Sequence, residues 1–319
     1  MNTNRAPRTR KREPLSPSEG FEGWDDYAPF YDWENARTFG RRDIQFWRNL
    51  ARQAGGSVRE RGCGTGRIAA PLGRAGVPLF GIDRSEGMLA YARTRLRRAR
   101  LTDRVRLILG DIRQLPFPPV GGGTLDPGPG TRDSGSGVRR SAAQARSSKS
   151  SPRSRIPGAD GFPGFSMVMA PYGILQSLLH ERDLASTLSE VQRVLAPGGT
   201  FGLELVADLP SWEEYSQRVS LKGWRGRRGG AHVTLVETVR QDRARRRTIF
   251  DQEFTERRGA RKRVHRFSLA FRTLSVPQMA RRLEKAGFEI SALLGDYRGR
   301  AWDERAEAWL ILARKPVLK

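Results

Sequence analysis

The sequence is poor in the residue types that build metal and disulfide sites. Its 319 residues include one cysteine and three histidines, so an internal disulfide is excluded and a structural zinc site is disfavoured. No apolar run approaches the length of a membrane span, and the basic N-terminus lacks the apolar core of a secretory signal. These absences predict a cytoplasmic protein with no metal site and no membrane partner.

Apolar residues are also scarce, at 37% of the chain, which indicates that part of it does not fold. Residues 1–20 form a basic tail, and residues 118–164 alternate glycine, serine and arginine without hydrophobic periodicity. We therefore predict a disordered tail at 1–20 and a disordered insertion at 118–164. The folded domain is expected to consist of residues 21–117 and 165–319.

The formal net charge is +24. Such a charge suits a nucleic-acid partner or an arginine-rich but solvated surface. Arginines occur in every segment rather than in one stripe, so the sequence favours solvated faces and leaves nucleic-acid contact as the lesser possibility.

The most informative stretch is residues 57–83. Gly62, Gly64 and Gly66 crowd a turn between a predicted strand at 57–61 and an apolar segment that reads as a helix. Glycines let a ligand approach the backbone, and the N–H groups of a helix start would point at it. A short apolar strand then ends on Asp83, about 20 residues past the first glycine, the spacing of a carboxylate that binds a ribose diol.

The segments Glu60 to Arg67 and Gly81 to Leu89 resemble the first two motifs of the class I S-adenosylmethionine (SAM) dependent methyltransferases. The resemblance extends to the turn at 196–200 and covers nearly everything except the tail and the insertion. It implies an α/β fold with a doubly wound, mostly parallel seven-stranded Rossmann-like sheet whose last strand is antiparallel. It also implies methyl transfer from SAM to nitrogen or oxygen of a small-molecule acceptor.

The same resemblance implies a set of cofactor contacts. The glycines would approach the methionine part of SAM, Glu60 would engage its amino group, and Asp83 would bind the ribose hydroxyls. Further residues would surround the adenine or complete the pocket. The full set is Glu60, Gly62, Cys63, Gly64, Gly66, Asp83, Arg84, Met88, Asp111, Ile112 and Ala170.

Acceptor-side residues are less evident. The aromatic segment Phe21 to Tyr31 is expected either to pack a helix on the core or to cap the cofactor pocket. Tyr31, Tyr172 and His180 are candidates for the catalytic side of the pocket. Ala170 to Tyr172 lacks the amide or carboxylate and the second proline of the adenine-N6 methyltransferase motif, which disfavours base methylation.

The C-terminal third departs from the minimal fold. Segments 233–239, 247–256 and 264–271 alternate apolar and polar residues, which predicts a three-stranded antiparallel layer at about 230–272 over the cofactor mouth. Its turns, at 243–247 and 257–263, are strongly basic and are expected to be solvated.

Arg59 and Arg61 stand where the family has aliphatic residues, on a strand that should be covered on both faces. They must find carboxylates or water, or the fold is weakened. Together with Ser166 and the insertion, they motivate an alternative: a basic RNA-associating protein with a non-catalytic methyltransferase fold. The acceptor's identity and the oligomeric state are not readable from the sequence.

Overall fold

The computed structural model describes residues 23–38, 42–114, 117, 120, 163–207, 212–226 and 230–317. The predicted tail at 1–20 and almost all of the predicted insertion at 118–164 lie outside these ranges, so their disorder stays a prediction. Within the described ranges, no helix is long and apolar enough to cross a lipid bilayer.

The central sheet has seven strands: β1 (Val58–Arg61), β2 (Leu79–Asp83), β3 (Val105–Leu109), β4 (Phe165–Ala170), β5 (Leu195–Leu205), β10 (Glu289–Leu294) and β11 (Trp309–Arg314). Their order is β10-β11-β5-β4-β1-β2-β3. The strands from β5 to β3 run parallel, whereas β11 is antiparallel to both of its neighbours. The predicted doubly wound sheet with an antiparallel last strand is confirmed.

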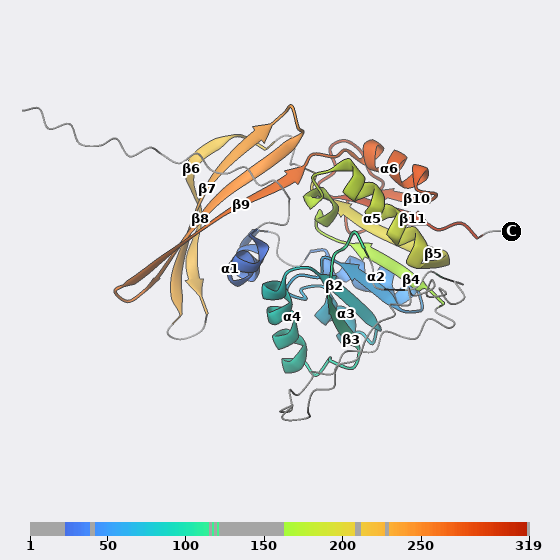
Figure 1. Cartoon of the computed structure of the whole chain (residues 1–319), viewed down its shortest axis with the longest axis horizontal. Helices are drawn as coiled ribbons and strands as arrows, with labels where there is room; N and C mark the ends of the chain where they lie inside the picture. Colours follow the sequence, from blue (N-terminus) through green and yellow to red (C-terminus); the bar gives the residue numbers. More distant parts are fainter. Residues whose placement is uncertain are drawn as a thin grey trace, which may run out of the picture.

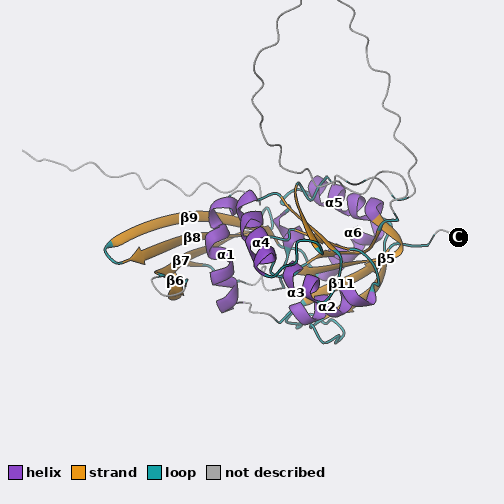
Figure 2. Ribbon diagram, turned by 90° about the horizontal axis from the view of Figure 1, so that it is seen from below, coloured by secondary structure: helices purple, strands orange, loops and turns teal. Residues whose placement is uncertain are grey.

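Helices cover both faces of this sheet (Figure 2). On one face, α5 (Glu181–Val194) and α6 (Val276–Lys285) contribute to one hydrophobic cluster. On the other, α2 (Ile44–Gln53) and α3 (Ala69–Arg74) contribute to a second. Because side chains alternate along a strand, the residues of β4 divide between the two clusters. The sheet is therefore buried on both sides, as parallel sheets are.

Serine caps set the start of two helices, as the sequence predicts. The Ser85 hydroxyl accepts from the Met88 N–H at 3.0 Å and begins α4 (Glu86–Arg98). Ser275 and Gln278 form a reciprocal capping box at the start of α6. Each cap satisfies backbone donors that the helix itself leaves unpaired.

A second, antiparallel sheet has the order β6-β7-β8-β9. The prediction of three strands is wrong in number, because a fourth strand lies at one edge. That edge strand has a mostly exposed, irregular pattern and two register shifts, so it shows no period of two. The strands are β6 (Tyr215–Arg225), β7 (Ala231–Asp242), β8 (Arg247–Arg258) and β9 (Arg261–Arg272).

The helix α1 (Trp24–Thr38) lies between the antiparallel sheet and α4 (Figure 1). Its apolar side chains share a cluster with residues of β7, β8 and β9. The rings of Phe30 and Phe254 stack with their centroids 4.4 Å apart. α1 thereby joins the antiparallel sheet to the rest of the molecule.

The boundary of β5 differs from the prediction. The turn predicted at residues 196–200 lies within β5, which begins at Leu195. In its pairing with β4, Leu195 lies opposite Phe165 and Thr200 lies opposite Met167. Residues 196–199 therefore bulge out of the ladder while remaining within the strand.

Arg59 and Arg61 of β1 are both fully buried. The Arg59 guanidinium lies 4.3 Å from the centroid of the Phe117 ring, and its nitrogens find no hydrogen-bond acceptor among the described residues. Arg61 donates one bond, to the Ile112 carbonyl oxygen. Burial lowers the pKa of Arg61 to about 9, and burial together with the charges of Arg61 and Arg193 lowers the pKa of Arg59.

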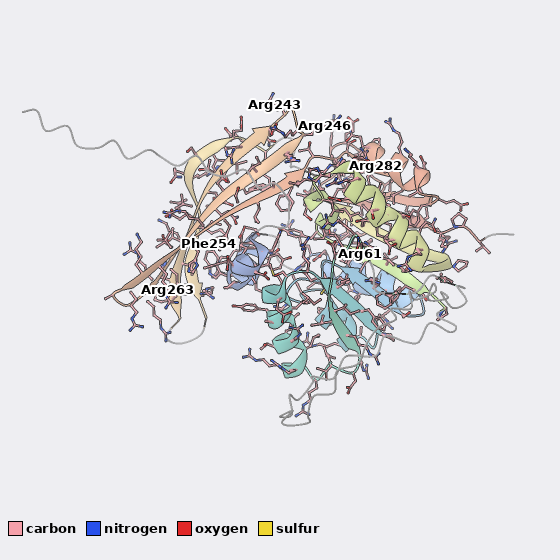
Figure 3. The ribbon with its side chains drawn as sticks, viewed as in Figure 1. Arg61, Arg243, Arg246, Phe254, Arg263 and Arg282 are labelled. Carbon is pink, nitrogen blue, oxygen red and sulfur yellow. The ribbon has the colours of Figure 1, made fainter. Side chains whose placement is uncertain are left out.

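These two side chains therefore find an aromatic face and one carbonyl in place of the expected carboxylate or water. Figure 3 shows Arg61 inside the central sheet, while Arg243, Arg246 and Arg263 lie at the ends of the antiparallel sheet. The two predicted basic turns are exposed. A cation over an aromatic ring offsets only part of the cost of desolvation.

Replacing Arg59 by methionine is expected to raise the free energy of unfolding by about 1–4 kcal/mol, because it removes a buried, unpaired charge while keeping an unbranched apolar stem. Urea unfolding of the full chain measures the change. The matched control is Arg106→Met on the exposed side of β3, which should change stability by less than about 0.5 kcal/mol. A destabilised Arg59→Met protein would show that the guanidinium supports the sheet.

Candidate functional site

The first strand ends in a tight glycine bend. Gly62, Gly64 and Gly66 have φ angles of 62°, 51° and 74°, in the left-handed region that glycine adopts without strain. A Cβ on Gly64 would meet no atom within 4 Å, so the backbone there borders open space. The helix expected to follow at once begins only at Ala69 and has six residues. The bend is therefore built from turns and not from a helix start.

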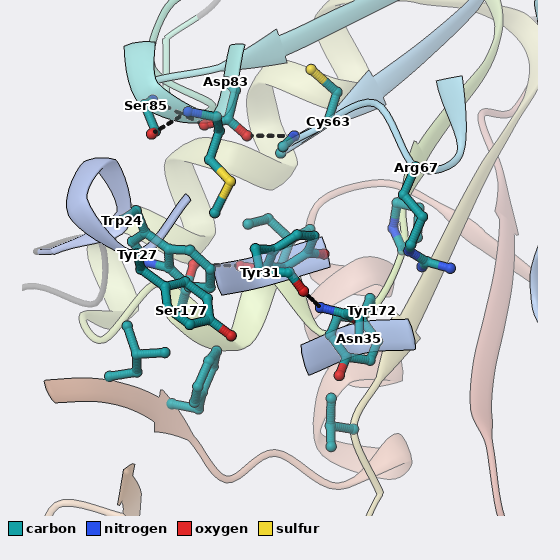
Figure 4. A pocket seen from close by; sticks show the side chains of 18 of the residues that line it. Trp24, Tyr27, Tyr31, Asn35, Cys63, Arg67, Asp83, Ser85, Tyr172 and Ser177 are labelled. Carbon is teal, nitrogen blue, oxygen red and sulfur yellow. Dashed lines mark hydrogen bonds between the residues drawn. The ribbon is translucent and has the colours of Figure 1, made fainter. Parts of the chain in front are cut away.

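Asp83 faces this bend from the end of β2. The Gly64 N–H donates to Asp83 Oδ2 at 2.8 Å, and the Ser85 N–H donates to Oδ1 at 2.9 Å (Figure 4). Burial raises the pKa of Asp83, while these backbone donors act in the opposite direction. Each carboxylate oxygen keeps a further lone pair. Asp83 is therefore arranged to accept two neighbouring hydroxyl groups.

Glu60 lies one residue before the end of β1 and is 2% exposed. Its Oε2 accepts no hydrogen bond from any residue that the structure describes, and the side chain lines a cavity. Burial raises the pKa of Glu60 well above its ordinary range, with the positive charge of Arg67 opposing. A buried carboxylate oxygen without a donor fits a cationic group brought by a ligand.

The cavity lies at the carboxyl ends of the central strands. The strand order reverses between β1 and β4, and ligands of doubly wound sheets bind at such a switch point. Figure 4 shows Asp83 and Ser85 on one side of it and Tyr31, Asn35 and Tyr172 on another. The predicted site residues that line it are Glu60, Gly62, Cys63, Gly64, Asp83, Arg84, Met88, Asp111 and Ile112, with Tyr31 and Tyr172.

Three predicted site residues do not line this cavity. Gly66 faces the Cβ of Ala92, because the third glycine of the bend turns toward α4. Ala170 is fully buried, since its side chain falls on the sheet face covered by α5 and α6. His180 is the residue before α5. The structure therefore gives no support to ligand contacts at Gly66, Ala170 and His180.

Asp111 follows β3 and is already paired. Arg113 Nη2 lies 2.7 Å and Arg84 Nη1 3.4 Å from Asp111 Oδ2. Partial burial raises the pKa of Asp111, but the hydrogen bonds from Arg113 outweigh it and lower the pKa below its ordinary value. A ligand amine would share this carboxylate with two guanidinium groups.

Two aspartates hold α1 against α4 and the end of β2. Asp25 Oδ1 accepts from the Ser85 hydroxyl at 2.6 Å and from the Gly87 N–H at 2.9 Å. Asp32 pairs with Arg95 of α4 at 2.5 Å. These contacts place the aromatic helix directly above the end of β2.

The aromatic segment Phe21 to Tyr31 was expected either to pack on the core or to cap the pocket, and in its described residues both roles are found. Phe30 and Trp33 are buried against the antiparallel sheet. Trp24, Tyr27 and Tyr31 of the same helix line the cavity. α1 therefore packs on the core with one side and covers the cavity with another.

Sequence reasoning missed the polar residues at the antiparallel sheet. Glu34 of α1, Glu237 of β7 and Gln252 of β8 all line the cavity. One signal was available: Glu237 interrupts an otherwise apolar alternating face, between Leu235 and Val239. A carboxylate in such a series is buried and needs a partner.

Residues 58–121 match a family model described as a methyltransferase domain. Over this segment the chain is similar to methyltransferase domains. An uncharacterised methyltransferase of Geobacillus sp. (strain WCH70) is 34% identical over 103 residues, which are 31% of this chain and 46% of that protein. The match thus spans less than half the length of that curated relative.

Solved structures share the fold of the methyltransferase domain. A SAM-dependent methyltransferase from Clostridium acetobutylicum has a TM-score of 0.64 at 14% identity, over 91% of this chain and 99% of that one. The sugar N-methyltransferase KedS8 from Streptoalloteichus sp. has a TM-score of 0.60 at 14% identity, over 99% and 100%. CcbJ from Streptomyces caelestis has 0.58 at 19%, over 86% and 90%. At such identities the likeness concerns the fold.

Substituting Gly87 by alanine is expected to loosen α1. A Cβ there would lie 2.6 Å from the Asp25 carbonyl oxygen, and relieving such an overlap costs about 1–3 kcal/mol. The helix gain of about 0.5–1 kcal/mol for Gly→Ala does not offset it. Hydrogen exchange should speed up roughly tenfold across residues 24–38.

The control for this substitution is Glu86→Ala, which removes an exposed partner of Arg93 from the same turn of α4. It should leave exchange in α1 unchanged. Unaltered protection of α1 in the Gly87→Ala protein would contradict the close packing of the two helices.

Proposed function

We propose that this chain is a SAM-dependent methyltransferase that methylates nitrogen or oxygen of a small-molecule acceptor. The observation that carries the proposal is Asp83 facing the glycine bend, with lone pairs left for a ribose diol and a cavity beside it. A matching domain model at residues 58–121 supports it.

The residues present fit SAM. Glu60 offers an unpaired, buried carboxylate oxygen to the amino group, and Asp83 offers two acceptors to the ribose hydroxyls. Met88 and Ile112 provide apolar contacts near Asp111 for the adenine. Bound SAM supplies a methyl group activated by its sulfonium, so the protein needs no catalytic triad.

The chain then orients the methyl donor and the acceptor and excludes water. α1 covers the cavity, and the antiparallel sheet supplies the wall opposite the glycine bend with Glu237, Phe250 and Gln252. Tyr31 and Tyr172 are placed to contact an acceptor, whereas His180 is not among the lining residues. A covered cavity of this kind suits a small molecule better than a nucleic-acid duplex. By its name, the fold relative KedS8 acts on a sugar.

The RNA-associating alternative loses part of its motivation. Arg59 and Arg61 are fully buried and are not available to a phosphate backbone. Ser166 and the insertion are its other motivations, and almost all of the insertion lies outside the described residues. The burial of Arg59 and Arg61 without carboxylate partners is the feature that favours this alternative, whereas Asp83 and the cavity favour the enzyme.

Asp83→Ala is expected to weaken binding of S-adenosylhomocysteine at least tenfold, because hydrogen bonds to a charged group are each worth about 1.5–3 kcal/mol. Isothermal titration of the full chain measures the affinity. Asp103→Ala, in the exposed loop between α4 and β3, is the matched control and should bind as the parent does.

Absence of S-adenosylhomocysteine binding to the parent protein at millimolar ligand would reject the enzyme. Equal binding by the parent and Asp83→Ala proteins would reject Asp83 as the ribose ligand. Incubation with SAM and a metabolite pool, followed by mass spectrometry for methylated products, tests the activity directly.

A further inference from the structure

At the end of the cavity formed by α1 and the antiparallel sheet, where the methyl acceptor would bind, one side-chain amide joins two carboxyl groups. Gln252 Nε2 donates to Glu237 Oε1 at 2.8 Å and to Glu34 Oε1 at 3.2 Å. Tyr27 donates to Glu34 Oε2 at 2.6 Å, and Tyr215 lies 3.5 Å from Glu237 Oε2. In the described ranges neither carboxyl group forms an ion pair, so both face the cavity with neutral hydrogen-bond partners only.

Further unpaired acceptors lie at the same place. Gln252 is 5% and Asn35 4% exposed, and the side-chain oxygens of both amides accept no hydrogen bond within the described chain. Both residues line the cavity. The cluster is thus rich in acceptors and short of donors, and a buried acceptor left unpaired costs about 1–3 kcal/mol.

Aromatic rings complete the surroundings. Rings from α1, β8, β9 and residue 212 line the cavity together with the two carboxylates. An ammonium group supplies the hydrogen-bond donors that these oxygens lack, and its charge is attracted to ring faces. A neutral hydroxyl supplies one donor and no charge. The aromatic residues concerned are Trp24, Tyr31, Trp212, Phe250 and Phe271.

We propose that Glu34, Glu237 and Gln252 form the acceptor subsite for the ammonium group of a small-molecule amine, with Glu34 as the proton acceptor. The proposal deepens the proposed function, on which it rests. The ammonium gives one proton to the Glu34 carboxylate, which leaves a neutral amine with a free lone pair and a neutral glutamic acid. The oxygens of Glu237 hold the nitrogen in place.

The electrostatics of the cluster agree with this assignment. Burial raises the pKa of Glu34 to about 7; the hydrogen bond from Tyr27 opposes this, and the charge of Glu237 adds to it. Tyr172, from the loop after β4, is the other titratable group that interacts with Glu34. A carboxylate with such a pKa exchanges a proton readily near neutral pH.

The test uses benzylamine as the probe and benzyl alcohol as its neutral counterpart, titrated at pH 8 into the full chain saturated with S-adenosylhomocysteine. Benzylamine should bind at least tenfold more tightly than the alcohol. Glu34→Gln and Glu237→Gln should each reduce its affinity about tenfold or more. The matched control is Glu253→Gln on β8, whose carboxylate pairs with Arg266 outside the cavity and whose loss should change nothing.

The parent protein gives a second readout that needs no variant. Between pH 6 and 8 the ionised fraction of Glu34 rises, so benzylamine affinity should increase about tenfold across a midpoint near 7. Glu34→Gln should abolish this increase. Glu237→Gln should move the midpoint to lower pH, because it removes the charge that helps to raise the pKa of Glu34.

Equal affinity for benzylamine and benzyl alcohol would overturn the proposal, and so would affinity that does not depend on pH. Full benzylamine affinity in both glutamine variants would overturn it as well. Loss of S-adenosylhomocysteine binding is measured separately and rejects only the proposed function. Amine selectivity in a protein that does not bind S-adenosylhomocysteine would support an amine-binding site that has no role in methyl transfer.

Discussion

The hydrogen bond from Gly64 to Asp83 joins the ends of two adjacent central strands and defines the cavity beside them. It requires a backbone that turns through left-handed φ angles after β1, and a strand β2 that ends on a carboxylate in the right register. The parallel pairing of the two strands supplies that register. The same carboxylate accepts from the Ser85 N–H, and Ser85 in turn docks α1 through Asp25.

The fold could be read from the sequence wherever a local pattern determines it. The alternating strands β7, β8 and β9 and the caps at Ser85 and Ser275 follow from periodicity and capping chemistry. β6 escaped prediction because an edge strand with little buried surface carries no alternating pattern. The burial of Arg59 and Arg61 was foreseeable, but their aromatic and carbonyl partners were not, because Phe117 and Ile112 are brought to them by the fold.

The cofactor half and the acceptor half of the site differ in the same respect: local sequence patterns predict the residues of the first and not those of the second. The expected cofactor residues lie within residues 60–112 apart from Ala170, and most of them line the cavity because consecutive parallel strands end at one edge. Glu34 and Gln252 are 218 positions apart and meet only because α1 packs on the antiparallel sheet. No spacing rule links such residues. The interruption of an apolar strand face by Glu237 was the single local sign of them.

The separation of the two sheets has an evolutionary consequence. The residues proposed to bind the methyl donor come from the glycine bend and the parallel strands, and the proposed amine-binding residues come largely from β7 and β8. Drift in the antiparallel layer can therefore change which molecule is accepted while the machinery for the methyl donor is inherited intact.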